Sequence, residues 1–140
     1  MNKICTSIEQ SKKLIKLGID VNTADMRYGY IAPYEFSDRK YDGGYDMIPY
    51  HKDFFDRCSN FSADEYDDEL PCWSLSALIE LMGECRMERT PLDQSGLFTH
   101  SFVDDYFNIR TYEEYDIVDA AVEMIYKLKE KDLLWNRIQT

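Results

Sequence analysis

Apolar side chains recur at helical spacing in three segments of the chain. The first segment begins at Thr6, where Thr6 and Glu9 have the spacing of a capping box. It ends near Leu17, and Gly18 suits the left-handed residue that commonly follows a helix. Three lysines, at positions 12, 13 and 16, lie near the negative end of the helix dipole. The pattern predicts a helix over about residues 6–17.

A second helix is predicted from Ser74 to Met82. Ser74 is a good N-cap, Trp73 before it can pack on Leu78, and Gly83 ends the helix. The apolar stripe that we expect to face the core consists of Leu75, Leu78, Ile79 and Met82.

A third helix is predicted over about residues 116–131. One apolar face alternates with charged positions, and Glu123 and Lys127 are oriented favourably for an ion pair between residues four apart.

Between these helices the pattern changes to that of short strands. Residues 97–110 read as two strands with Asp104 and Asp105 at the turn, and residues 85–89 alternate and can pair beside them. Six tyrosines fall within residues 27–50, where Asp42, Gly43 and Gly44 suggest a hairpin tip. Phe54 and Phe55 lie in a further short helical segment, 51–59. Because helices and strands do not alternate regularly, we predict an α+β fold in which a small antiparallel sheet carries about three packed helices.

Length and composition limit the class of protein. A chain of 140 residues with 44% apolar residues is expected to form a single compact domain over 1–140. No apolar run exceeds three residues, so the sequence predicts neither a membrane span nor a signal peptide, and we expect a cytoplasmic protein. The formal net charge of −11 disfavours binding to nucleic acid or to anionic membranes.

The acidic side chains are concentrated in the middle of the chain. Residues 1–17 hold four lysines and one glutamate, whereas residues 64–69 hold five acids around Tyr66. Such a run is costly to bury, so it is a surface loop or a face that binds cations or a basic partner. Oxygen ligands for a divalent cation are abundant there, but neither this run nor residues 38–46 fits a calcium-loop spacing, so a solvated loop is the default and no cofactor is expected.

The residues of catalytic chemistry are few. The four cysteines are far apart and form no close pair of the zinc-binding kind, and Cys72 and Cys85 read as small core residues. A zinc site built from some of the cysteines with His51 and His100 is the less favoured alternative. His100, within a predicted strand, is the candidate base, although a histidine there is more often a hydrogen-bonded structural residue. His51 has no partner that the sequence identifies.

The tyrosine-rich segment has two interpretations. Its tyrosines can form a recognition surface, because aromatic rings give a large contact area at little entropic cost, or they can be strand residues that close the core. Tyr41 and Tyr45 flank the predicted turn, so we expect them to be exposed. The binding residues predicted from the sequence are Tyr41, Tyr45, Tyr50, Asp64, Glu65, Asp67, Asp68 and Glu69.

Three stretches of the chain resemble a group of small uncharacterised proteins of gut Bacteroidales, their phages and mobile elements. The first stretch is residues 5–14, which begin Cys-Thr-Ser-Ile-Glu-Gln, together with residues 17–19 and 23–26. The others are residues 71–78, Pro-Cys-Trp-Ser-Leu-Ser-Ala-Leu, and residues 119–121 with 124–125. The resemblance implies a bacterial cytoplasm and an accessory role in a phage or mobile element. It implies no activity, and it does not extend to residues 27–50 or to the acidic run.

Two classes of function fit these observations. The first is a non-enzymatic acidic interaction module in which acidic and tyrosine side chains bind a basic protein, with mimicry of DNA as its sharper form. The second is a small enzyme that uses carboxylates with His100 or with a divalent ion. A pocket that unites a histidine with two carboxylates would favour the enzyme.

Overall fold

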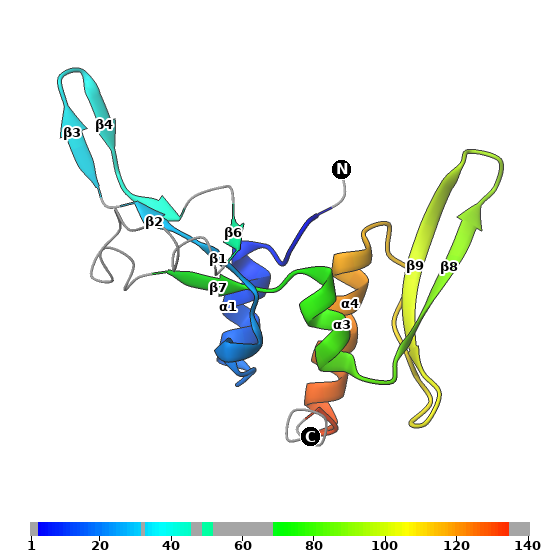
Figure 1. The fold of residues 1–140 in the computed structure, drawn as a ribbon. Helices are drawn as coiled ribbons and strands as arrows, with labels where there is room; N and C mark the ends of the chain where they lie inside the picture. The colour runs from blue at the N-terminus through cyan, green and yellow to red at the C-terminus, as the bar shows by residue number, and fades with distance from the viewer. Residues whose placement is uncertain (1–2, 32, 46–48, 52–68, 135–140) are drawn as a thin grey trace.

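The fold is described from a computed structural model of the 140-residue chain, over residues 3–31, 33–45, 49–51 and 69–134. Its helices are α1 (Ile8–Lys16), α3 (Leu75–Met82) and α4 (Ile117–Glu130), with a short 3-10 turn at Val21–Thr23. Helices α3 and α4 lie side by side, and two β-hairpins extend from the helical body in different directions (Figure 1). The predicted α+β class is confirmed.

The strands form small antiparallel sheets rather than one continuous sheet. The first sheet has the order β6 (Tyr50–His51), β1 (Met26–Tyr28) and β7 (Leu70–Cys72), and the second has the order β10 (Ile109–Arg110), β9 (Leu97–Asp104) and β8 (Arg86–Leu92). Two further pairs join β2 (Tyr30–Ile31) to β5 (Gly44–Tyr45) and β3 (Tyr34–Phe36) to β4 (Arg39–Tyr41). The expected pairing of residues 85–89 beside residues 97–110 is confirmed by β8 and β9.

Strands β2 to β5 make one interrupted hairpin whose tip differs from the prediction. The turn lies at Ser37 and Asp38, where Ser37 has a φ of 55°, and not at Asp42, Gly43 and Gly44. The interruption lies where Gly43 faces Pro33: a Cβ added at Gly43 would come within 2.9 Å of the proline ring. Proline has no N–H to donate to the ladder, so the glycines relieve a crowded crossing instead of forming the turn.

The first helix begins one residue later than its capping-box pattern predicts. Ser7 is the N-cap: its hydroxyl accepts from Gln10 N at 3.1 Å, and the Gln10 side chain accepts from Ser7 N at 2.9 Å. Thr6 is instead buried, and its Oγ1 accepts a hydrogen bond from Trp73 N at 3.0 Å. Because the Thr6 hydroxyl is used by Trp73, the N-cap is Ser7 and not the predicted Thr6. The end at Gly18 is confirmed by its φ of 91° and by the Ile19 N to Leu14 O bond of 3.1 Å.

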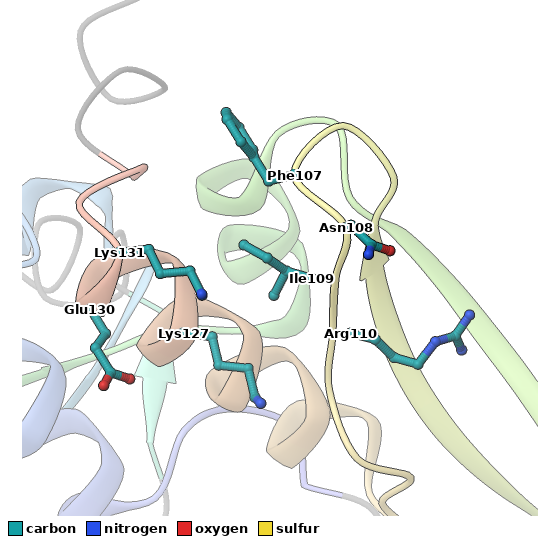
Figure 2. A pocket seen from close by; sticks show the side chains of 7 residues that line it. All are labelled: Phe107, Asn108, Ile109, Arg110, Lys127, Glu130 and Lys131. Carbon is teal, nitrogen blue, oxygen red and sulfur yellow. The ribbon is translucent and has the colours of Figure 1, made fainter.

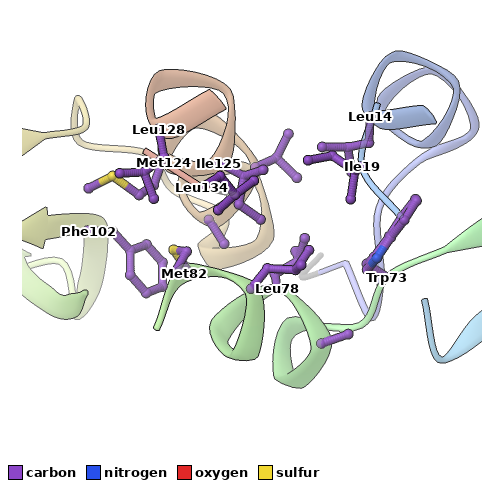
Figure 3. Packing of buried hydrophobic residues seen from close by; sticks show 14 of the residues in the cluster. Leu14, Ile19, Trp73, Leu78, Met82, Phe102, Met124, Ile125, Leu128 and Leu134 are labelled. Atoms are coloured by element: carbon purple, nitrogen blue, oxygen red, sulfur yellow. The ribbon is translucent and has the colours of Figure 1, made fainter. Parts of the chain in front are cut away.

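The main core lies where α1, α3, α4 and β9 meet (Figure 3). Trp73 and Leu78 belong to this core, as the predicted packing of Trp73 on the second helix requires. The buried face of α3 is nevertheless rotated from the prediction, because Leu81 is 4% exposed and Ile79 is 43% exposed. Its buried residues are Ala77, Leu78, Leu81 and Met82.

Strand β9 is longer than predicted. It continues through Asp104, and the turn follows at residues 105–108. Asp104 Oδ1 accepts from the backbone N–H groups of Tyr106 and Phe107 at 3.0 and 3.2 Å. Asp104 therefore ends the strand as the acceptor of an aspartate turn. The predicted second strand within residues 97–110 is present as β10, but it begins at Ile109, because Tyr106 and Phe107 lie in the turn.

Candidate functional site

A short loop between β10 and α4 presents two exposed tyrosines among acidic side chains. We call residues 111–116, Thr-Tyr-Glu-Glu-Tyr-Asp, the acidic aromatic loop. Tyr112 is 76% exposed and Tyr115 is 68% exposed. Glu113 is exposed as well, and Glu114 is half-buried. Exposed tyrosines of this kind are enriched in protein interfaces, because a rigid ring gives contact area at low entropic cost.

Strand β9 holds one side of this loop in place. His100 and Glu114 exchange two backbone hydrogen bonds, His100 N to Glu114 O at 2.6 Å and Glu114 N to His100 O at 2.8 Å. The His100 ring adds a third bond, since its Nδ1 lies 3.1 Å from Tyr115 O and donates to that carbonyl. Thr111 is buried and bonds to Phe102 through both its backbone N–H and its hydroxyl. These hydrogen bonds fix the loop against β9.

Helix α4 and the N-terminal segment hold the other side. Asp116 is the N-cap of α4, and its Oδ1 accepts from Val118 N at 2.8 Å and Asp119 N at 3.1 Å. The backbone N–H of Lys3 donates to Asp116 Oδ2 at 2.7 Å, and the Lys3 ammonium bonds to Asp119 at 2.6 Å. Carboxylates at the first turn of a helix are stabilised by its dipole, so Asp116 and Asp119 have structural partners.

Within the described part of the chain, the carboxylates of Glu114 and Glu123 have fewer hydrogen bonds and ion pairs than those of Asp116 and Asp119. Burial, followed by the charges of Glu123 and Asp119, raises the pKa of Glu114 above its ordinary value. Glu123 Oε1 accepts from Tyr112 N at 3.3 Å, while its buried Oε2 has no hydrogen-bond partner among the residues that the structure describes. The predicted Glu123–Lys127 ion pair is not formed there, because the Lys127 ammonium lies 5.1 Å from the centre of the Tyr112 ring. Among the described residues, neither Glu114 nor Glu123 forms an ion pair with a cation.

The histidine predicted as a base has a structural role. His100 lies in β9, and its Nδ1 is used to hold the Tyr115 carbonyl. The groove that the structure describes next to α4 is lined by neither histidine. Within the described ranges, no group of three or more histidine, cysteine or acidic residues is arranged to hold a metal ion.

Among the residues predicted for binding, those that the structure describes belong to other segments than this loop. Tyr41 and Tyr50 belong to β4 and β6, where they pair with Tyr34 and Arg27. Asp64, Glu65, Asp67 and Asp68 lie outside the described residues. Glu69 is described, and its side chain forms an ion pair with Arg27 at 2.6 Å.

Tyr45 differs from its predicted exposure. It is half-buried, and its ring meets Tyr30 edge to face at 5.5 Å between centroids. It also packs on a second buried cluster, which contains Cys5, Tyr28, Leu70 and Cys72. Strand pairing thus turned Tyr45 toward the protein, although the sequence pattern placed it beside a turn.

The cysteines Cys5 and Cys72 lie together in that second cluster. A hydrogen bond from Cys72 lowers the pKa of Cys5 to about 7, and the same bond raises the pKa of Cys72. The Tyr28 hydroxyl lies 3.5 Å from Cys5 Sγ and donates to Thr6 O at 2.7 Å. Both thiols are buried, which was expected for Cys72 only, and among the described residues no group of three or more possible ligands is arranged to hold a metal ion.

Sequence reasoning overlooked the acidic aromatic loop. Its signal was present, because Tyr112 and Tyr115 alternate with acids immediately before a helix cap and without the apolar partners of a buried strand. The sequence-based prediction placed the tyrosine surface at residues 27–50, where tyrosines are more numerous.

A scan against models of known protein families, a search among curated proteins and a search among solved structures each returned no match to this chain. In the part of the chain that the structure describes, no helix combines the length and the apolar character that crossing a membrane requires.

Proposed function

We propose that this protein is a non-enzymatic interaction module whose acidic aromatic loop binds a basic protein. The observation that carries the proposal is the rigid presentation of Tyr112 and Tyr115 in front of the incompletely compensated carboxylates of Glu114 and Glu123. A loop that is already ordered loses little entropy on binding, so more of the contact energy becomes affinity.

The chemistry of the loop favours an arginine-rich or lysine-rich partner. Tyrosine faces attract cations, at about 0.5–1 kcal/mol for an exposed contact. The Lys127 ammonium already lies near the Tyr112 ring, which illustrates this kind of contact within the chain. The overall charge of −11 would also speed the approach of a basic protein.

The alternative, a small enzyme based on carboxylates and His100, receives less support. The Nδ1–H bond to Tyr115 O leaves Nε2 of His100 as the acceptor nitrogen, but His100 does not line the groove described next to α4. The same bond serves the module directly, because it fixes the loop that carries the tyrosines.

The wider setting is part of the same proposal. We infer a bacterial cytoplasmic protein that is accessory to a phage or mobile element, and the support for this setting is the resemblance described above. The acidic run at residues 64–69 would add to the attraction for a basic partner, and the net charge disfavours direct binding of nucleic acid.

Fluorescence anisotropy with a labelled octa-arginine peptide tests the proposal. The test variant is the double substitution Tyr112→Ser and Tyr115→Ser, and the matched control is Tyr106→Ser, which removes a tyrosine that is 84% exposed outside the loop. Losing two cation–ring contacts of about 0.5–1 kcal/mol each weakens binding roughly 5- to 30-fold. The control should change the dissociation constant by less than about twofold.

Equal losses for the double variant and the control would refute the loop as the binding surface. So would a peptide affinity that neither variant changes, since general attraction to an acidic protein would then explain the binding. Circular dichroism of each variant confirms that the fold is retained.

A further inference from the structure

A groove of about 540 Å³ lies between the C-terminal half of α4 and the turn that joins β9 to β10 (Figure 2). This volume is in the range of small-molecule sites. Its lining residues are Phe107, Asn108, Ile109, Arg110, Lys127, Glu130 and Lys131.

The groove is basic although the protein is acidic. Three cations and one carboxylate line it in a chain with a net charge of −11. Figure 2 shows Lys131 and Ile109 extending toward each other from the two sides, while Glu130 points away from Ile109. Lys127 lies in α4 and Lys131, four residues later, is the C-cap of that helix, so their like charges lie on one side of the helix end and repel each other slightly.

The end of α4 does not require these lysine side chains as caps. Asp132 has a φ of 59°, its N–H donates to Lys129 O at 3.0 Å, and Leu133 N donates to Leu128 O at 2.9 Å. Lys131 N likewise donates to Lys127 O at 3.2 Å. Backbone groups therefore satisfy these carbonyls. Among the described residues, neither Lys127 nor Lys131 has a carboxylate within ion-pair distance.

The cations of the groove that remain free of ion pairs with the described residues are its two lysines. The Arg110 guanidinium is engaged with both oxygens of Glu88, so its planar fork, which suits a carboxylate or a phosphate, is already occupied. The lysine ammoniums remain, and lysine binds phosphate as a point charge. Phe107 and Ile109 add an apolar wall to the same groove.

We propose that this groove binds the phosphate group of a small ligand, with Lys131 and Lys127 as its cationic contacts and Phe107 beside the rest of the ligand. The site is independent of the partner proposed for the acidic aromatic loop. Lys127 lies near Tyr112, so Lys131 is the residue whose change separates the two sites.

The test uses amide NMR titrations of the whole chain with three probes: AMP, inorganic phosphate and adenosine. AMP and phosphate should both shift the signals of Ile109 and Lys131, and tighter binding of AMP would show that the apolar wall contributes. Lys131→Glu should weaken the binding of AMP at least about fivefold, because it replaces attraction of the phosphate by repulsion.

Lys129→Glu is the matched control. Lys129 has the same charge in the same turn, but its ammonium lies beside Gly18, 3.8 Å from the position of an added Cβ. The control should change AMP affinity by less than about twofold. The proposal is overturned if both variants lose the same AMP affinity, or if adenosine binds as tightly as AMP. It is also overturned if 20 mM AMP causes no shifts, which would limit the binding free energy to roughly −2 kcal/mol. Lys131→Glu should leave the affinity for the arginine peptide within about twofold, so failure of one site is distinguishable from failure of the other.

Discussion

Helix α3 offers a direct test of which face of the helix is buried. The apolar stripe in the sequence includes Ile79, whereas the structure buries Leu81 in its place. The substitutions Leu81→Ala and Ile79→Ala shorten two similar aliphatic side chains two residues apart. Their relative costs therefore report the orientation of the helix and little else.

The expected magnitudes follow from exposure. Leu81 is 4% exposed, so Leu81→Ala loses nearly the whole transfer free energy and leaves a cavity, together about 3 kcal/mol within the usual 2–5. Ile79 is 43% exposed, so Ile79→Ala loses only about half of the transfer free energy, near 1 kcal/mol. The higher helix propensity of alanine returns a few tenths of a kcal/mol. We expect the two costs to differ by about 2 kcal/mol.

Urea denaturation followed by circular dichroism measures both costs. With an m-value of about 1–3 kcal/mol/M, Leu81→Ala should lower the midpoint by roughly 1–3 M at unchanged m, and Ile79→Ala by less than about 1 M. The reasoning is refuted if Ile79→Ala costs as much as Leu81→Ala, because the stripe read from the sequence would then be the buried face.

Three further predictions concern local features of the fold. Gly18→Ala should lower the free energy of unfolding by about 1 kcal/mol, because φ is 91° there, and a neutral result in thermal denaturation would contradict the left-handed helix end. Ser7→Ala should lower the free energy of unfolding by about 1 kcal/mol and Glu9→Ala by only about 0.3 kcal/mol. The reverse order would support the capping box of Thr6 and Glu9 that the sequence predicts. The hydrogen bond from Arg110 and that from Arg86 lower the pKa of Glu88 to about 2, so its ion pairs contribute at pH values above its ordinary pKa of 4.5 and are lost as the pH falls toward 2. Arg110→Gln should move the Glu88 midpoint upward in a carboxyl-carbon NMR titration, and an unchanged midpoint would count against the pair.

Local signals in the sequence located the helices well. Gly18, Ser74 and Gly83 have backbone roles that few residues can fill, so the C-terminal end of α1 and both ends of α3 were predictable. The α+β class followed from the mixture of helical and strand periods. These features depend on interactions within a few residues of chain.

The errors arose where distant residues compete for a role. Thr6 could not cap α1 because Trp73, far along the chain, uses its hydroxyl. The glycines at 43 and 44 serve the crossing with Pro33 and not the hairpin tip. Neither partner is visible from local spacing.

The candidate site was missed for a related reason. Counting tyrosines favoured residues 27–50, but pairing in β5 makes Tyr45 half-buried, while Tyr112 and Tyr115 remain exposed. What distinguishes the loop is the pair of bonds from His100 that hold Glu114, and only the register of β9 against residue 114 reveals them. The sequence could suggest an acidic surface with tyrosines, and the fold supplied its location.

The central claim is that the acidic aromatic loop is the surface that binds a basic partner. The most direct measurement is an amide NMR titration of the intact chain with unlabelled octa-arginine at 0.15 M salt, where long-range attraction between exposed charges is largely screened. The largest shifts should cluster at residues 111–116 and at Glu123. Shifts spread evenly over the acidic surface, or centred on residues 27–51 with the loop unchanged, would contradict it.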